Sequence, residues 1–159
     1  MITLATAADL PQILAIYAHA RAFMVQHGNP NQWGASRPTE ADITAHIAAR
    51  ELYVLREADA IHGVFAFILG EDPTYRVIEQ GAWLSDAPYG TIHAVASDGQ
   101  IHGLLSQIVA YCEQTTKHLR IDTHHDNAIM QHVILKNGFT RCGIIHIASG
   151  AERIAFEKV

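Results

Sequence analysis

The segment from Thr91 to Gln114 joins an apolar strand pattern, a short loop with two glycines and an amphipathic helix pattern. The first amides of a helix have no partner within it, and the helix dipole places partial positive charge there. We therefore expect the amides of Gln100–Leu105 to face a phosphate, with Gly99 and Gly103 letting a ligand approach the backbone closely. An ordinary turn before a core helix would give the same pattern, because short glycine motifs also occur by chance.

Side chains that could move a proton follow on a predicted strand. Asp122 alternates there with Arg120 and His124, so the three side chains share one face. An imidazole has an unperturbed pKa near about 6.5 and can exchange a proton at neutral pH. His93, at the strand end before the loop, is a further candidate. Alternatively, Asp122 only orients Arg120 or a loop amide, His124 is an ordinary polar residue, and His93 belongs to the core.

Histidines are frequent, with eleven among 159 residues, and this raises the question of a metal site. They are dispersed, and none forms an HExxH motif or a Cys/His cluster. The adjacent His124 and His125 would point to opposite faces of an extended segment. We therefore predict no metal site.

Composition excludes several classes of partner. The formal net charge is -5 and the few Lys and Arg residues are scattered, which argues against nucleic acid and anionic membranes. No stretch is long and apolar enough to span a membrane, and the N-terminus does not resemble a secretion signal. Cys112 and Cys142 lack paired spacing, as expected for free thiols in a reducing, cytoplasmic compartment.

Caps and hydrophobic periodicity place the elements that must position these residues. Strands are predicted at 2–4, 52–55, 61–69, 118–123, 141–147 and 153–156, in addition to the strand before the glycine loop. Helices are expected to begin at Thr6–Asp9, at Thr39–Asp42, after the glycine loop and at Asp126–Asn127. No linker or repeat interrupts this order, which implies a single domain over residues 1–159, with a mixed sheet and helices on both of its faces.

Two tryptophans lie in segments without a regular pattern. Trp33 sits among turn-forming residues, where it could line a pocket or cover the core. Trp83 lies in the ambiguous segment Tyr75–Gly90 and could supply a sheet edge or a pocket wall. Both are candidate substrate-binding residues.

Two blocks of the chain resemble the GNAT-type N-acetyltransferase superfamily, and the order of elements matches it from end to end. The family's cofactor loop has the form Gln/Arg-x-x-Gly-x-Gly/Ala, with a Val five residues upstream, and this chain has Gln100–Leu105 with Val95. The second block, LRIDTHHDNAIMQHVILKNGF, carries the family's helix-start Asn at Asn127 and closes on Lys136, Gly138 and Phe139.

The resemblance implies a fold and a cofactor. The expected fold is α/β, with a mixed, mostly antiparallel sheet of about six to seven strands. The expected cofactor is acetyl-CoA, with its pyrophosphate on the loop amides and its pantetheine arm along the strand edge. The implied cofactor-binding residues are His93, Ala94, Val95, Gln100, Ile101, His102, Gly103, Leu104, Leu105 and Asn127. Lys136 is a weaker candidate for a CoA phosphate.

Three residues depart from the family pattern. Leu105 stands where Gly or Ala is preferred, and Gln100 replaces the commoner Arg, which removes a positive charge from an anion site. Many relatives have a Tyr seven residues after the Asn that protonates the leaving thiolate, and this chain has Ile134 there. The general acid would have to be another group, such as Tyr53, Tyr75, Tyr89 or solvent.

The implied activity is transfer of an acetyl group from acetyl-CoA to a primary amine of a small molecule or peptide, by direct attack in a ternary complex. Some relatives carry an acidic base five residues before the Asn, and Asp122 fills that place. The implied catalytic residues are Asp122, His124 and His93. A non-catalytic acyl-CoA sensor and a metal-dependent hydrolase using the same three residues are the alternatives, and the apolar C-terminal strands could form a homodimer edge.

Overall fold

Helices begin at the capping residues that the sequence indicates. In the computed structural model, which describes residues 1–159, the Thr39 hydroxyl accepts the Asp42 amide at 3.1 Å and opens α2 (Glu40–Ala48). Asn127 does the same for α4 (Ala128–Lys136), with its Oδ1 3.0 Å from the Met130 amide. Each side chain satisfies an amide that the helix leaves without an internal partner.

The first helix starts later than its capping residues predict. Thr6 precedes a short 3-10 turn, η1 (Ala7–Asp9), and α1 (Leu10–Gln26) follows it. The Asp9 carboxylate accepts the Thr6 amide at 2.9 Å and the Arg56 guanidinium at 2.6 Å. The second contact comes from another part of the chain, which is why local sequence did not reveal it.

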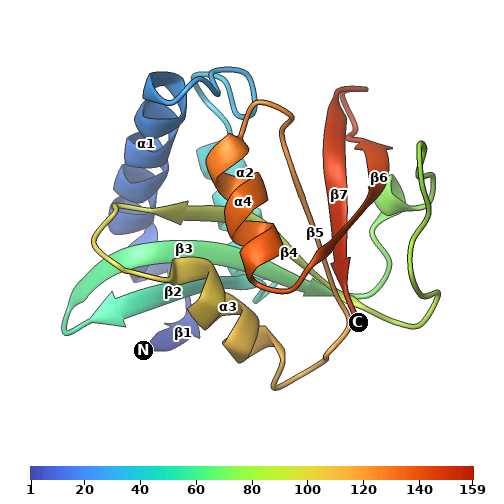
Figure 1. Ribbon diagram of the computed structural model, residues 1–159. Helices are drawn as coiled ribbons and strands as arrows, with labels where there is room; N and C mark the ends of the chain where they lie inside the picture. The colour runs from blue at the N-terminus through green and yellow to red at the C-terminus, as the bar shows by residue number, and fades with distance from the viewer. The chain divides into compact units, whose positions relative to one another are not determined.

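Seven strands form the sheet in the order β1-β2-β3-β4-β5-β7-β6 (Figure 1). Their bounds are β1 Ile2–Leu4, β2 Leu52–Glu57, β3 Ala60–Leu69, β4 Gly90–Ser97, β5 Leu119–Thr123, β6 Thr140–His146 and β7 Glu152–Lys158. β4 and β5 are parallel, whereas β1-β2, β2-β3, β5-β7 and β6-β7 are antiparallel. The expected mixed, mostly antiparallel α/β fold is confirmed.

The hairpin between β2 and β3 is tighter than the predicted turn over residues 56–60. Pairing continues to Glu57 and Ala60, so only Ala58 and Asp59 form the turn. Ala58 takes a positive φ of 53°, which lets a two-residue loop close between twisted strands. A sequence without the usual Asn-Gly or Asp-Gly signal gave no indication of such a short loop.

The chain forms two compact units: Met1–Phe67 with His93–Leu104, and Ile68–Ile92 with Leu105–Val159. In the first unit, α1 and α2 pack with β2 and β3 on one apolar core. Its buried members include Ile13, Tyr17, Ile43, Val54 and Val64. The single domain over residues 1–159 stays a prediction.

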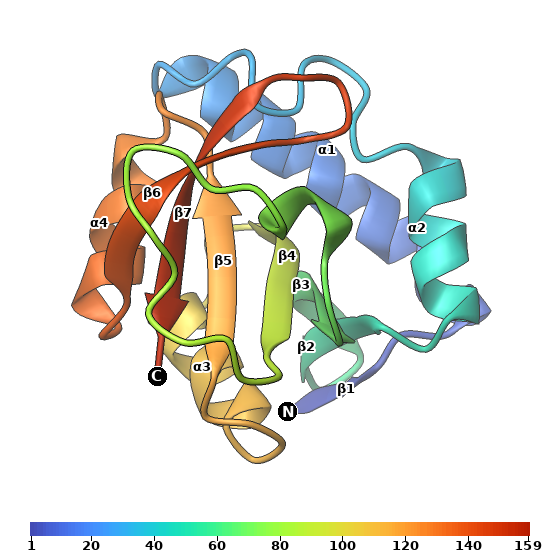
Figure 2. The same cartoon turned by 90° about the vertical axis from the view of Figure 1, so that its right-hand side faces the viewer.

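In the second unit, β5, β7 and β6 lie side by side, and the segment between η2 (Pro73–Tyr75) and β4 crosses in front of them (Figure 2). Tyr75 and Tyr89, at the two ends of that segment, share a small core with Ile145 and Ala155, and Trp83 packs against it. The segment whose pattern was ambiguous is therefore a loop fixed at both ends by buried aromatic rings.

Only one of the two C-terminal strands lies at an edge of the sheet. β7, which carries the IAF sequence, pairs with β5 on one side and β6 on the other, so its backbone groups are used and the expected edge is wrong for this strand. β6 is the outer strand, and at Ile144 it also exchanges two backbone hydrogen bonds of 2.8 Å with Glu79. A homodimer edge would therefore have to form on the remainder of β6.

Both cysteines are buried free thiols, as the sequence predicted. Cys112 lies in α3 (Leu104–Cys112), and burial raises the pKa of its thiol to about 12. A thiol that stays protonated is a poor nucleophile and metal ligand, so Cys112 acts as a core residue. No helix is both long and apolar enough to cross a membrane.

Candidate functional site

The glycine loop joins β4 to α3 within a sharp turn. Gly99 and Gly103 have φ angles of 82° and 64°, a region that favours glycine. An added Cβ at Gly99 would meet nothing within 4 Å, so backbone conformation, not space, selects the residue. The first amides of α3 follow directly, as an anion-binding loop requires.

One carboxylate already lies at the start of this loop. Asp98 accepts the Gln100 amide through Oδ1 at 3.0 Å, and its Oδ2 lies 2.7 Å from Nδ1 of His62 on β3. The Gln100 amide is therefore engaged inside the loop. Among the amides of Gln100–Leu105 that were predicted to face a phosphate, those from Ile101 onward are therefore the better candidates for an external anion.

Leu105, the residue that departs from the family's Gly or Ala, is 2% exposed. A side chain buried in this way is not presented to an approaching ligand. The core therefore accommodates a side chain larger than Gly or Ala at this position. His102, by contrast, is exposed at the turn.

The strand before the loop is distorted at Ala94. Its φ is 53°, and its carbonyl oxygen accepts the hydroxyl of Tyr17 at 2.7 Å. His93, Ala94 and Val95 are all half-buried, so this segment is neither sealed in the core nor fully solvated. Partial exposure of the backbone is what strand addition by an amide-rich ligand needs.

Trp33 lies edge-on to Tyr17, with 5.6 Å between the ring centroids. It packs against the core of the first unit and is half-buried. Trp33 thus covers the core, as one of its two predicted roles required. Its substrate-binding role stays a prediction.

Asp122 on β5 has a hydrogen-bond partner that the sequence could not place. The hydroxyl of Tyr75 donates to Asp122 Oδ2 at 2.6 Å. Tyr75 is 1% exposed, and burial, followed by the charge of Asp122, raises the pKa of its hydroxyl well above the usual value. Asp122 itself is half-buried, so a phenol that keeps its proton holds a carboxylate that a ligand can reach.

His124 follows β5 and has its own local partner. Its Nδ1 accepts the Asp126 amide at 2.9 Å. Burial, and then the charge of Arg153, lowers the pKa of the ring, which favours the neutral form. With Nδ1 engaged as an acceptor, the ring proton resides on Nε2, so neither ring nitrogen has a free lone pair with which to accept a proton. Asp122 is therefore the stronger candidate base of the two.

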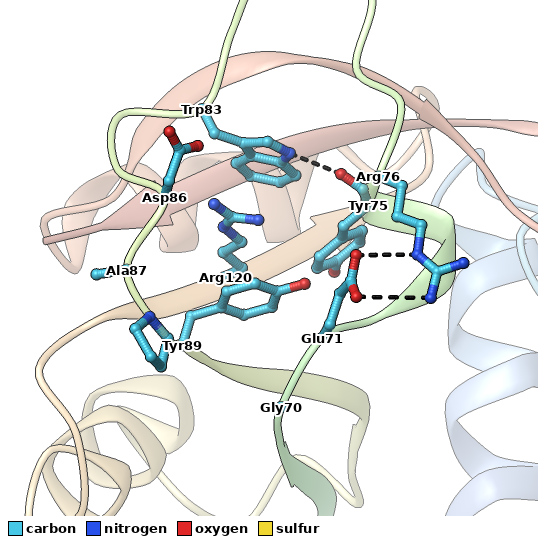
Figure 3. A pocket seen from close by; sticks show the side chains of 10 residues that line it. Gly70, Glu71, Tyr75, Arg76, Trp83, Asp86, Ala87, Tyr89 and Arg120 are labelled. Carbon is cyan, nitrogen blue, oxygen red and sulfur yellow. Dashed lines mark hydrogen bonds and ion pairs between the residues drawn. The ribbon is translucent and has the colours of Figure 1, made fainter.

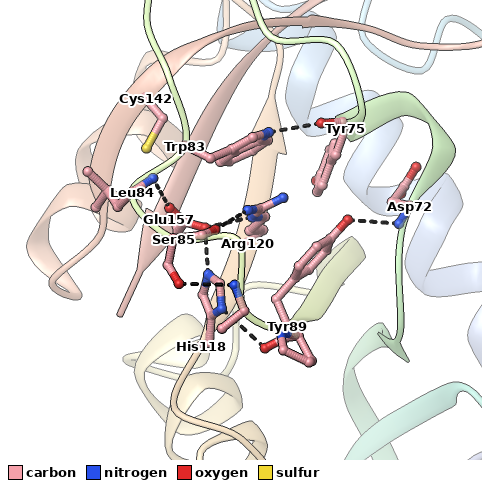
Figure 4. A network of polar contacts seen from close by, with 12 residues as sticks. Asp72, Tyr75, Trp83, Leu84, Ser85, Tyr89, His118, Arg120, Cys142 and Glu157 are labelled. Carbon is pink, nitrogen blue, oxygen red and sulfur yellow. Dashed lines mark hydrogen bonds and ion pairs between the residues drawn. The ribbon is translucent and has the colours of Figure 1, made fainter.

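Arg120 belongs to a buried network of charged and polar groups centred on Glu157 (Figure 4). Glu157 is fully buried and accepts Arg120 Nε at 2.6 Å, His118 Nε2 at 2.5 Å and the Leu84 amide. Burial opposes its charge, but the hydrogen bonds from His118 and Arg120 prevail and lower the pKa of the carboxyl group. The network holds the loop around Leu84 against β5 and β7.

Arg120 lies between two aromatic rings. Its guanidinium carbon is 3.9 Å from the ring centroid of Trp83 and 3.9 Å from that of Tyr89. Both contacts have cation–π geometry and fix the plane of the guanidinium. Glu157 and the Ser85 carbonyl hold the guanidinium, so its partners differ from the predicted alternative in which Asp122 orients Arg120.

These aromatic side chains line an open cavity of about 450 Å³ (Figure 3). Arg120, Tyr75, Trp83 and Tyr89 form its inner part, and charged residues of the loop stand around its mouth. The lining residues are Gly70, Glu71, Tyr75, Arg76, Trp83, Asp86, Ala87, Pro88, Tyr89 and Arg120. The prediction that Trp83 could supply a pocket wall agrees with this position.

Sequence reasoning missed Glu157 and gave Arg120 no role of its own. A signal was available, since each charge interrupts an apolar strand, in LRIDT and IAFEK. A charge in such a place is rarely buried unless it is paired. Across the chain, no three His, Cys, Asp or Glu side chains form a group that could hold a metal ion.

Searches of protein-family models and of curated proteins found no match. Among solved structures, an acetyltransferase of the GNAT family from Streptococcus agalactiae is 29% identical, with a TM-score of 0.89 over 100% of this chain and 94% of that one. A putative acetyltransferase from Staphylococcus aureus shares the fold at 22% identity, with a TM-score of 0.71 over 99% of this chain and 97% of that one.

A phosphinothricin acetyltransferase from Sinorhizobium meliloti, solved with acetyl-CoA, also shares the fold. Its TM-score is 0.64 at 16% identity, over 99% of this chain and 86% of that one. The chain therefore has the fold of GNAT-family acetyltransferases over its full length, and this likeness supports a GNAT-type acetyltransferase that depends on acyl-CoA.

Proposed function

We propose that this protein transfers an acetyl group from acetyl-CoA to a primary amine of a small molecule or peptide. The observation that carries the proposal is the full-length likeness to the Streptococcus agalactiae acetyltransferase, at 29% identity. Acetyl-CoA is the cofactor in the structures of two neighbours that share the fold, from Salmonella typhimurium and Sinorhizobium meliloti. The cytoplasmic location and the homodimer expected from the sequence belong to the same proposal.

The cofactor would be held mainly by backbone groups. In the first unit, the loop amides after Gln100 would bind the pyrophosphate, and the half-buried segment His93–Val95 would pair with the pantetheine arm. The cofactor-binding role of Asn127, in the second unit, stays a prediction, and its Oδ1 already caps α4. Because these are mostly main-chain contacts, glycine geometry is the feature to test.

The chemistry would proceed without a covalent enzyme intermediate. The amine nitrogen bonds to the thioester carbonyl carbon, the carbon–sulfur bond breaks, and the products are an N-acetylated amine and CoA. Asp122 would take the proton that the amine loses, directly or through water. The thiolate takes up a proton from solvent. A neutral imidazole is too weak an acid to protonate a thiolate, so the Nε2–H of His124 would contribute a hydrogen bond rather than a proton.

Calorimetric titration with acetyl-CoA tests the cofactor site. Gly103→Glu puts bulk and negative charge at a positive φ inside the loop, and we expect it to abolish saturable binding. Gly28→Glu is the matched control, because Gly28 also has a positive φ but lies just after the end of α1. Equal loss in both folded variants, or no binding by the wild type, would overturn the proposed cofactor site.

A non-catalytic acyl-CoA sensor is the second candidate function. It is favoured by Ile134, which is 0% exposed and stands where many relatives have the Tyr that protonates the leaving thiolate. A residue sealed in the core cannot deliver a proton to a thiolate. Acetyl-CoA binding without release of CoA across a panel of amines would support the sensor, and release of CoA together with an acetylated amine would dismiss it.

A further inference from the structure

The buried guanidinium of Arg120 has hydrogen-bonding capacity that the protein does not use. Nε donates to Glu157 at 2.6 Å and Nη2 donates to the Ser85 carbonyl at 2.8 Å. Nη1 makes no hydrogen bond within the chain, although Arg120 is only 4% exposed and lines the cavity. An arginine fixed between two rings with a free nitrogen at a cavity wall is a preorganised donor for an oxygen acceptor.

A second donor lies beside it. The hydroxyl oxygen of Tyr89 accepts the Asp72 amide at 2.8 Å, so the hydroxyl proton itself is available for donation. Tyr89 is 8% exposed, and its ring contacts the guanidinium. Arg120 and Tyr89 can therefore donate to the two oxygens of one carboxylate.

The acidic residues near this cavity do not prevent Arg120 and Tyr89 from binding a negatively charged group. Glu157 has its charge shared between Arg120 and His118. Glu71 is paired with Arg76 at 2.9 Å on the exposed rim, and Asp86 is exposed, so water screens its charge. Figure 3 shows Asp86 and the Glu71–Arg76 pair at the mouth, with Arg120 further inside.

One residue of the cavity wall contacts the candidate base. Tyr75 lines the wall, lies 5.2 Å from Trp83 and 6.2 Å from Tyr89 between ring centroids, and donates its hydroxyl proton to Asp122. Asp122 follows Arg120 by two positions on β5, so the two side chains emerge on one face about 6.6 Å apart along the strand. A ligand that reaches both groups would bind its carboxylate and its amine over the same face of β5.

Resting on the proposed function, we propose that the acceptor is a free amino acid, whose carboxylate binds Arg120 Nη1 and the Tyr89 hydroxyl and whose amine faces the Tyr75–Asp122 pair. The apolar walls of Trp83 and Tyr75 would pack against its side chain. Acetylation would then give an N-acetylamino acid and CoA.

Binding can be measured without any cofactor. The indole N–H of Trp83, which donates to the Tyr75 carbonyl at 2.9 Å, reports on the cavity in ¹⁵N-edited NMR spectra, and Trp33→Phe assigns it. Each proteinogenic L-amino acid is titrated, and those that bind are repeated as their carboxamides. We expect saturable shifts at Trp83, and binding at least about tenfold weaker for the amide, because a charge-assisted hydrogen bond is lost.

Variants add an independent readout. Arg120→Lys should weaken amino-acid binding about tenfold or more, and Tyr89→Phe should do so by several fold. Arg141→Lys is the matched control, because it makes the same change at an exposed arginine outside the cavity lining. We expect it to bind as the wild type does. If Arg120→Lys does not fold, the comparison of acid with amide still decides, since it needs no variant.

The proposal is overturned if no amino acid moves Trp83, if acid and amide bind equally, or if folded Arg120→Lys binds normally. An amino acid that binds but is not acetylated in the presence of acetyl-CoA would support the pocket and contradict the proposed function. Acetylation of simple amines with no preference for a carboxylate would support the proposed function and contradict the amino-acid pocket.

Discussion

The glycine loop and the aromatic cavity are built in opposite ways. The loop belongs to one continuous stretch, and its defining features are the backbone angles at Gly99 and Gly103 and the start of α3. The cavity combines a loop after β3 with Arg120 on β5, and it depends on Glu157 near the end of the chain. A site made of local backbone can be recognised in a sequence, whereas a site made of distant side chains appears only after folding.

The difference also concerns energy. The loop relies on the start of a helix, whose first amides have no partner within the helix, and this costs little in water. The cavity requires a carboxylate that is 0% exposed to be matched by an arginine and a histidine. Breaking such a pair leaves an uncompensated buried charge, so the cavity should be the more fragile of the two.

The largest effect is expected at Glu157. Glu157→Gln removes the charge that holds Arg120 and His118, and we expect the free energy of unfolding in urea to fall by about 3–5 kcal/mol. Glu71→Gln, which breaks the exposed ion pair with Arg76 on the loop after β3, should change the free energy of unfolding far less, because water screens that pair. Similar losses in both variants would refute the distinction between the buried and the exposed pair.

A substitution at Asp122 tests the catalytic step separately from cofactor binding. Asp122→Asn keeps the size of the side chain and an acceptor for Tyr75, and we expect kcat/KM for an accepted amine to fall about a hundredfold or more, with unchanged affinity for acetyl-CoA. Steady-state kinetics and calorimetry measure the two quantities. Equal loss of activity and cofactor binding would instead indicate a folding or cofactor defect.

The buried carboxylate also predicts a pH dependence of stability. The folded state lowers the pKa of Glu157 below its ordinary value of 4.5. Its stabilising contribution is therefore complete above that value and is lost as the pH falls toward and through the lower folded-state pKa. Urea unfolding between neutral and acid pH should show this loss in the wild type and a smaller loss in Glu157→Gln. Parallel curves would contradict the assignment.

The smallest effect is expected in the glycine loop, at Asp98. Asp98→Asn keeps an oxygen for the Gln100 amide but removes a negative charge from the proposed phosphate loop, and we expect acetyl-CoA to bind about two- to fivefold tighter at low salt. The gain should shrink at high salt. Asp59→Asn, in the exposed turn of the β2-β3 hairpin, is the control for charge alone. Weaker binding would mean that Asp98 shapes the loop more than it repels the ligand.

Helix starts and most strands could be predicted because their signals are local. Thr39 and Asn127 cap helices through contacts three residues away, and the apolar alternation of β5 and β7 is visible in the chain. The loop with Tyr75, Trp83 and Tyr89 had no periodicity to read. Its conformation depends on aromatic packing and on backbone contacts with Arg120 and Glu157, which lie far along the sequence.

The sequence by itself determined the order of elements, the helix caps, the glycine loop and the presence of Asp122 on a strand face, because each follows from backbone propensity or side-chain spacing over a few residues. Only the tertiary structure decided that Tyr75 donates to Asp122, that the Nδ1 of His124 is already engaged, and that Arg120 presents a free nitrogen to a cavity. These outcomes depend on burial and on long-range partners, which change the protonation and availability of a group without changing its identity in the chain.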